Sequence, residues 1–163
     1  MPRERNEFLL AYNPDRQREL CQDKDDCIFG EYPTLAQLKA YGSKTASVWL
    51  MAHLVNLSEF CGCRDKLTGG VVEELADIIA GEWYYLKVTE LMLYFYKFKA
   101  GYYGKFYGAV DPLVITTSLR EFVKERNESI SRKDAEQAIE RMKEHQKGAV
   151  TYEEYKSMKE DTK

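Results

Sequence analysis

The residues with the clearest chemical potential lie in one short stretch, Tyr94–Gly108, which we call the aromatic–lysine segment. It holds eight aromatic residues, three lysines and three glycines, and no acidic residue. Aromatic rings stack on nucleic-acid bases, and lysine ammonium groups neutralise phosphates. The segment therefore suggests contact with single-stranded nucleic acid or a nucleoprotein. The candidate contact residues are Tyr94, Tyr96, Lys97, Lys99, Tyr103, Lys105 and Tyr107.

Two other interpretations of the same segment remain open. Tyrosines are often half-buried where helices meet, with their hydroxyl groups in water and lysine stems lying across the rings. Exposed tyrosines also suit a protein–protein interface. Three lysines are few for a track of phosphate contacts, so the residue types alone do not choose between these roles.

The cysteines and histidines do not predict a catalytic or metal site. The four cysteines are Cys21, Cys27, Cys61 and Cys63. Neither pair has the spacer of about two to four residues that structural zinc sites use. His53 lies in an apolar stretch, which is typical of a hydrogen-bonded core histidine, and His145 lies in a charged one. We therefore expect no catalytic residue, no metal ligand and no cofactor, and a protein that is not an enzyme.

Composition and charge fit a soluble globular protein. Of the 163 residues, 44% are hydrophobic and 31% are charged, and the net charge is −3, so no overall basic field attracts nucleic acid or anionic lipid. No apolar run is long enough for a secretory signal or a membrane-spanning helix. We expect a cytoplasmic protein without membrane contact.

The spacing of apolar residues predicts an all-α fold. Helix starts are indicated by Thr34, Thr68 and the Asp111-Pro112 pair, and a helix end by Gly42. The expected helices cover about 35–41, 43–60, 68–86, 89–100 and a stretch from 112 onwards. The helix over 43–60 is apolar on almost every face, which predicts a central position.

These elements predict one compact domain of about five helices, residues 30–127, with a polar N-terminal arm (1–29). A charged helical extension and a frayed tail (128–163) follow. The helix from Pro112 either continues to about Gln146 or breaks near Asn127–Ser131, where Ser131 offers a second cap. We favour the break. In the tail, Thr151 offers one more weak cap.

Part of the chain resembles a known family. The matching residues run from Gly30-Glu31-Tyr32-Pro33-Thr34, through Tyr41-Gly42 and Trp49-Leu50, to Phe98–Pro112 and Arg120-Glu121-Phe122. This pattern is similar to a family of small, uncharacterised helical proteins of gut bacteria and their phages or mobile elements. The resemblance covers about residues 30–126. It implies a helical, cytoplasmic protein carried by such an element, and it brings no catalytic residues.

Together these observations favour a non-enzymatic, nucleic-acid-associated accessory protein. The alternative is a protein-interaction module without nucleic-acid contact, using the charged helix over 128–147 or the same tyrosines. The two differ in salt dependence, because phosphate contacts weaken steeply as salt rises and apolar protein contacts do not.

Overall fold

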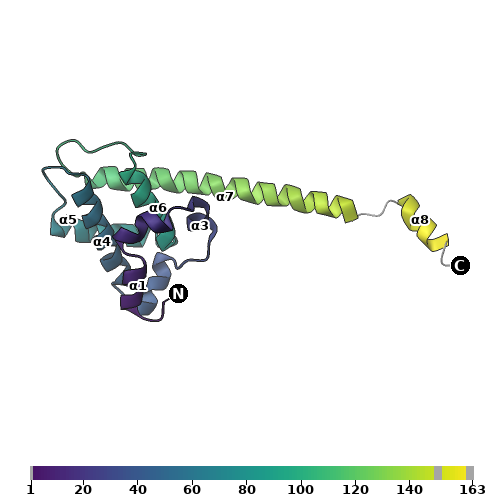
Figure 1. The fold of residues 1–163 in the computed structure, drawn as a ribbon, viewed down its shortest axis with the longest axis horizontal. Helices are drawn as coiled ribbons and strands as arrows, with labels where there is room; N and C mark the ends of the chain where they lie inside the picture. Colours follow the sequence, from purple (N-terminus) through teal and green to yellow (C-terminus); the bar gives the residue numbers. More distant parts are fainter. Residues whose placement is uncertain (1, 149–151, 161–163) are drawn as a thin grey trace. The chain divides into compact units, whose positions relative to one another are not determined.

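The protein is described by a computed structural model covering residues 2–148 and 152–160. Within these residues the chain forms eight α-helices and two short 3₁₀-helices, with no strand (Figure 1). The all-α prediction is confirmed. The elements are α1 (Arg5–Ala11), η1 (Pro14–Arg16), α2 (Gln17–Leu20), α3 (Lys24–Phe29), η2 (Leu35–Tyr41), α4 (Thr45–Phe60), α5 (Gly69–Glu82), α6 (Val88–Lys99), α7 (Pro112–Gly148) and α8 (Tyr152–Glu160).

The chain divides into two units, Met1–Phe122 and Val123–Lys163. The first unit includes the N-terminal residues that the sequence suggests are a separate polar arm. Phe8, Gln17, Cys21 and Cys27 of this stretch are buried. The Phe8 ring stacks on Tyr41, with ring centroids 5.4 Å apart. The boundary expected at residue 30 therefore differs from the structure, because single apolar side chains on short helices anchor an otherwise charged segment.

Helix α6 is the most completely buried helix of the first unit, and α4 packs against it. Every residue of α6 from Val88 to Phe95 is buried, and α2, α3 and α4 all contact this helix. Helix α4 buries Leu50, Leu54 and Leu57 but exposes Val55 and Phe60. The prediction of a central α4 is confirmed in that α5, α6, η1 and η2 all pack against this helix, but one side of α4 stays exposed, because apolar residues on all sides of a helix do not ensure that all sides are covered.

The predicted helix starts are confirmed by their capping contacts. Thr34 and Gln37 form a reciprocal capping box at the start of η2, and Gly42 ends that helix with a φ of 133°. The Thr68 hydroxyl accepts a hydrogen bond from the backbone N–H of Val71 at the start of α5. At the start of α7, the Asp111 carboxylate accepts one from the N–H of Leu113 over 2.8 Å.

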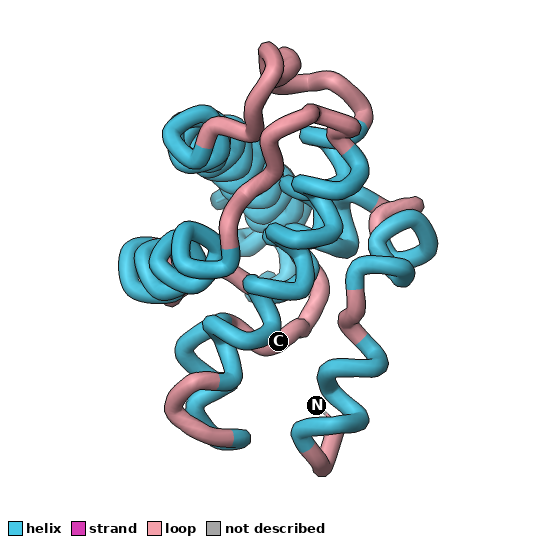
Figure 2. The backbone as a smooth tube through the Cα atoms, turned by 90° about the vertical axis from the view of Figure 1, so that its left-hand side faces the viewer, coloured by secondary structure: helices cyan, strands magenta, loops and turns pink. Residues whose placement is uncertain are grey.

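Two loops lie side by side at one end of the first unit, where pink tube gathers at the top of Figure 2. One loop follows α4 and the other joins α6 to α7. The Asp65 backbone joins them, since its N–H donates to Gly108 O and its carbonyl accepts from the N–H of Val110. Gly101, Gly104 and Gly108 have positive φ angles of 84°, 86° and 79°, which side chains other than glycine rarely allow. These turns set the path of the second half of the aromatic–lysine segment.

Helix α7 is continuous from Pro112 to Gly148. Its first turns bury Ile115, Leu119 and Phe122 within the first unit. The break favoured near Asn127–Ser131 is wrong: the Ser129 hydroxyl donates to the carbonyl of Glu125 over 3.0 Å, inside an unbroken helix. No proline or glycine interrupts that stretch, and serine and asparagine are tolerated in a helix interior at small cost.

The second unit contains the rest of α7 and the helix α8. The weak cap expected at Thr151 lies outside the described residues. Within the described residues, every helix is either too short or too polar to cross a lipid bilayer.

Candidate interaction surfaces

Tyr94, the first residue of the aromatic–lysine segment, belongs to the core. Its side chain is fully buried, and its hydroxyl lies 2.8 Å from both the carbonyl oxygen of Ile115 and the hydroxyl of Ser118. Burial raises the pKa of this phenol well above its ordinary value. The expected role of Tyr94 in stacking on a base is therefore wrong, because no face of the ring is accessible.

Lys99 is half-buried, and its ammonium group is held in a polar network. Its ammonium donates to Gln17 Oε1 over 2.8 Å and to the side-chain oxygen of Asn56. Gln17 Nε2 in turn donates to His53 Nδ1 over 2.7 Å, and His53 Nε2 donates to the carbonyl of Tyr12 over 3.0 Å. Partial burial lowers the pKa of Lys99. The expected role of Lys99 in following a phosphate backbone is thus not supported by its position.

His53 is the buried end of this network. Its side chain is fully buried, and burial lowers its pKa to about 4. Since Nε2 donates and Nδ1 accepts, the ring is held in the neutral form. The interpretation of His53 as a hydrogen-bonded core histidine is confirmed.

Tyr96 lies half-buried beside this network. It lines a surface pocket of about 310 Å³ together with Phe60, Lys99 and Arg18. The Lys99 ammonium also lies 5.5 Å from the centre of the Phe60 ring. Tyr96 is thus accessible on a different side of α6 from the buried Tyr94.

Lys97 lies over a group of aromatic rings. Its ammonium is 5.0 Å from the centre of the Tyr102 ring, 5.6 Å from that of Tyr103 and 5.8 Å from that of Phe122. Lys24 of α3 also lies over Tyr102, at 5.5 Å. The Tyr103 ring is half-buried and lies 5.7 Å from the ring of Tyr94. These contacts match the interpretation in which lysine stems cover partly buried tyrosines.

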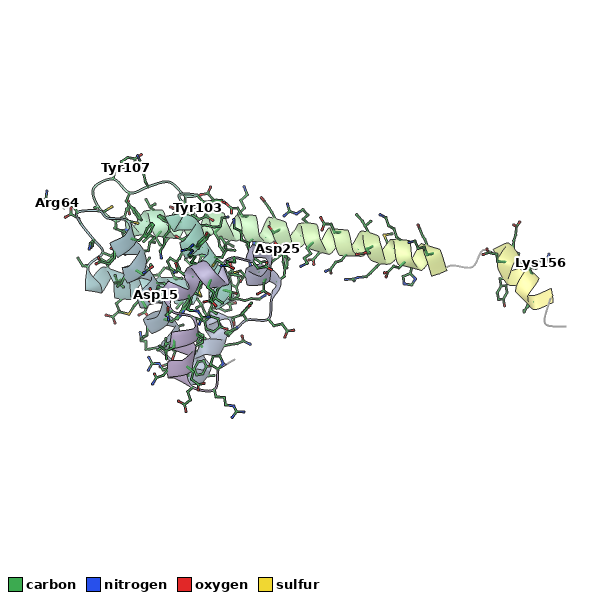
Figure 3. All side chains as sticks on the ribbon, in the orientation of Figure 1. Asp15, Asp25, Arg64, Tyr103, Tyr107 and Lys156 are labelled. Carbon is green, nitrogen blue, oxygen red and sulfur yellow. The ribbon has the colours of Figure 1, made fainter. Side chains whose placement is uncertain are left out.

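The tip of the loop after α6 carries the exposed part of the segment. Tyr107 is 84% exposed, and the Lys105 ammonium lies 5.5 Å from the centre of its ring. Figure 3 shows Tyr107 at the outer edge of the molecule, with the side chain of Arg64 also projecting outward from the adjacent loop. Arg64 lies far from Tyr107 in the sequence, so the sequence analysis did not identify it. The backbone pairing of the two loops brings the chain at Arg64 near the loop that carries Tyr107.

The seven predicted contact residues therefore do not form one surface. Successive residues of a helix point about 100° apart, so Tyr94, Tyr96, Lys97 and Lys99 project in different directions from α6. The turns at Gly101 and Gly104 then carry Lys105 and Tyr107 away from α6. Of the seven, Lys105 and Tyr107 at the loop tip are the exposed ones, whereas Tyr96, Lys97, Lys99 and Tyr103 are half-buried and Tyr94 is buried.

The cysteines form no metal site in the described part of the chain. No group of three or more His, Cys, Asp or Glu side chains comes together there. All four cysteines are free, and Cys21 and Cys27 are both buried. A hydrogen bond with the Cys27 thiol, and then burial, raise the pKa of Cys21, so this thiol is held protonated.

A second candidate surface lies on α7 beyond Phe122. Every side chain of this helix from Asp134 to Gly148 is exposed. Four apolar residues nevertheless fall on one side of it: Ala135, Ala138, Ile139 and Met142. Ile139 is 53% exposed and Met142 is 66% exposed. All four residues follow Ser131, so the sequence shows this stripe whether or not the helix breaks near Asn127–Ser131.

Comparison with known proteins places the chain in a family. A family model described as a family of unknown function, DUF6633, matches residues 66–163, more than half of the chain, so the protein belongs to this family. No curated protein and no solved structure matches it. The match includes α5, α6, the aromatic–lysine segment and the whole second unit. The expected membership of an uncharacterised family is thereby confirmed, whereas an origin in gut bacteria or their phages stays a prediction.

Proposed function

We propose that this member of the family is a non-catalytic protein-interaction module that binds a partner helix through α7 beyond Phe122. The observation that carries the proposal is the combination of full exposure and one-sided apolar residues from Asp134 to Gly148. Helices in proteins gain most of their stability from packing an apolar face. A partner supplies that packing for α7.

The internal sources of stability of the helix in this region are individually weak. Pairs of opposite charge three or four residues apart contribute only about 0.2–0.5 kcal/mol each. Like charges also occur at this spacing, as in Glu136, Glu140 and Glu144, which oppose helix formation. Covering Ile139 and Met142 would contribute more, since fully burying such a side chain is worth about 1.5–3 kcal/mol.

Site-specific photo-crosslinking in the expressing cell tests this proposal. A photoreactive phenylalanine analogue replaces Ile139 on the apolar stripe, or Glu140 on the opposite side as the matched control. We expect discrete cross-linked species from position 139 and none from position 140. If neither position gives an adduct, or both give the same diffuse background, the proposal is wrong.

A second candidate function is contact with single-stranded nucleic acid at the loop tip. It is supported by the exposed Tyr107 with Lys105 above its ring, and by Tyr102 between Lys24 and Lys97. Base stacking on such rings is worth about 1–3 kcal/mol per base. The acidic neighbours of Lys24, namely Asp23 and Asp25, reduce the local positive charge, which is why we place this function second.

Fluorescence anisotropy with a labelled single-stranded oligonucleotide tests the second function. Replacing Lys105 with Glu and Tyr107 with Ala should weaken binding at low salt, since one phosphate contact and one stacking ring are lost. Lys39→Glu, on η2, is the control for the change in charge. Absence of binding by the unaltered protein at low salt would exclude this function.

A further inference from the structure

The exposed stripe on α7 has the spacing of a two-helix interface. Ser131, Ala135, Ala138 and Met142 are separated by four, three and four residues, which is the alternation of the inner positions of a coiled coil. On a helix with 100° per residue these four side chains fall within a sector of about 60°. Ile139 lies at one edge of this seam, and Asp134 and Arg141 lie at the other.

We propose that the occupant of this seam is a second copy of the same chain, with its α7 running in the opposite direction. The proposal rests on the function proposed above and names its partner. In the reversed arrangement Ala135 of one copy lies opposite Ala138 of the other, and Ser131 lies opposite Met142. The small side chains at the centre allow the helices to approach closely, and each long Met142 packs over a short Ser131.

Charge complementarity fixes both the partner and the direction. Asp134 and Arg141 lie seven residues apart on the same edge of the seam. A reversed copy brings Asp134 opposite Arg141 of the second copy, and by symmetry this pair forms twice. A parallel copy would instead bring Asp134 opposite Ile139 and Arg141 opposite Gln146, with no ion pair.

Asp134 has no partner of opposite charge within its own helix at the usual spacing. The residues three and four positions away are Ile130, Ser131, Gln137 and Ala138, all uncharged. Arg141 donates a hydrogen bond to Gln137 over 3.4 Å, which leaves most of its guanidinium donors available. Arg141 also has Glu144 three residues further along its own helix, so the pair between copies competes with that contact for Arg141, whereas it gives Asp134 a partner that its own helix does not supply.

The length of α7 agrees with this register. The symmetry axis lies between Glu136 and Gln137, so Gly148 of the second copy lies opposite Glu125. The pairing then extends from Glu125 to Gly148, about 36 Å at 1.5 Å per residue. This is about three heptads, and it begins just after Phe122, the last residue of the first unit. The small and apolar seam covers its middle part, Ser131–Met142, and the next inner positions on either side, Glu128 and His145, lie opposite each other in the reversed copy.

Charge exchange on the purified full-length protein tests the proposal. Sedimentation velocity over a concentration series measures self-association. Asp134→Arg alone, or Arg141→Asp alone, places like charges opposite each other twice and should raise the dissociation constant at least about tenfold. An equimolar mixture of the two variants should restore association, and so should the double variant D134R/R141D.

Glu140→Arg, on the side of the helix away from the seam, is the matched control and should leave self-association unchanged. Circular dichroism of every variant confirms that its helices are intact. Unaltered protein that stays monomeric at about 500 μM overturns the proposal, as does failure of the mixture or of the double variant to recover association. In the photo-crosslinking experiment, adducts from position 139 to a different protein, or to residues 152–160 of the same chain, also overturn this proposal. The adduct to a different protein leaves the proposed function standing, whereas absence of any adduct removes both.

Discussion

Tyr94 and Tyr107 have the same side chain, thirteen positions apart in one aromatic stretch, and opposite surroundings. The hydroxyl of Tyr94 is enclosed and lies within hydrogen-bond distance of Ile115 O and Ser118, while Tyr107 extends into solvent. The difference arises from the φ angles at the glycines between them and from the helices packed around α6. A residue type within this segment therefore does not by itself identify a contact residue.

This contrast predicts different responses to removal of the hydroxyl group. Tyr94→Phe should lower the free energy of unfolding by roughly 0.5–1.5 kcal/mol, because a buried hydrogen-bonding group is lost. Tyr107→Phe should leave it unchanged within the error of the measurement. Urea denaturation followed by tryptophan fluorescence measures both. Equal stability of the two variants would contradict the buried position of Tyr94.

His53 predicts a dependence of stability on pH. Its pKa is about 4 in the folded protein, against an ordinary value of 6.5. Between these values the unfolded chain binds a proton that the folded protein does not, so stability is complete above about pH 6.5 and is lost as pH falls toward 4. The loss from this group alone reaches about 3 kcal/mol.

Denaturation at a series of pH values between 7 and 4 measures this effect, comparing the unaltered protein with His53→Gln and His145→Gln. We expect the His53 variant to show a smaller loss of stability over this interval, since carboxylates then remain the main titrating groups. His145→Gln should behave like the unaltered protein because His145 is exposed. The same pH dependence in all three proteins would show that His53 is not the responsible group.

At the scale of elements, local signals predicted three helix starts correctly, although the cap offered by Ser131 lies inside the continuous helix α7. Thr34, Thr68 and Asp111 each form the capping contact that their sequence neighbours suggest, because a cap depends on only a few adjacent residues. Which helix is covered on all sides was not predictable in this way. Helices α4 and α6 are both rich in apolar residues, and only the packing of α2 and α3 on α6 decides that α6 is covered.

The candidate site was less predictable than the fold for a related reason. Within the predicted segment Lys105 and Tyr107 are exposed, as a contact with a partner requires, but Tyr94 and Lys99 contact residues far away in the chain. Lys99 is bound by Gln17, and nothing near either residue in the sequence indicates that pairing. Long-range contacts of this kind require the tertiary structure.

Continuity of α7 is testable with a proline. Ser129→Pro should disrupt the helix, because proline removes a backbone donor and its ring clashes with the carbonyl of Glu125, at a cost of about 3 kcal/mol or more. Ser129→Ala should be tolerated, since it removes only the hydroxyl contact with that carbonyl. Helical ellipticity and hydrogen exchange over residues 123–135 measure the difference. If both variants keep the same helicity and protection, the chain is not helical at this position.

At the scale of the whole molecule, folding of the first unit is predicted not to depend on the second. The buried residues of α7 end at Phe122, and those of the other helices all precede it. A chain shortened after Asn127 therefore retains every buried apolar side chain of the described residues. It loses the seam from Ser131 to Met142, which the proposed pairing requires.

We expect this shortened chain to keep a cooperative thermal transition close to that of the full-length protein, and to be monomeric at all accessible concentrations. A chain shortened after Val114 is the matched control. It also loses Ile115, Leu119 and Phe122, and deleting large buried side chains costs about 2–5 kcal/mol each, enough to exceed the total stability of a typical domain. That control should not fold. If the chain ending at Asn127 also lacks a cooperative transition, residues beyond it are needed for folding, and their exposed apolar face then serves stability rather than binding.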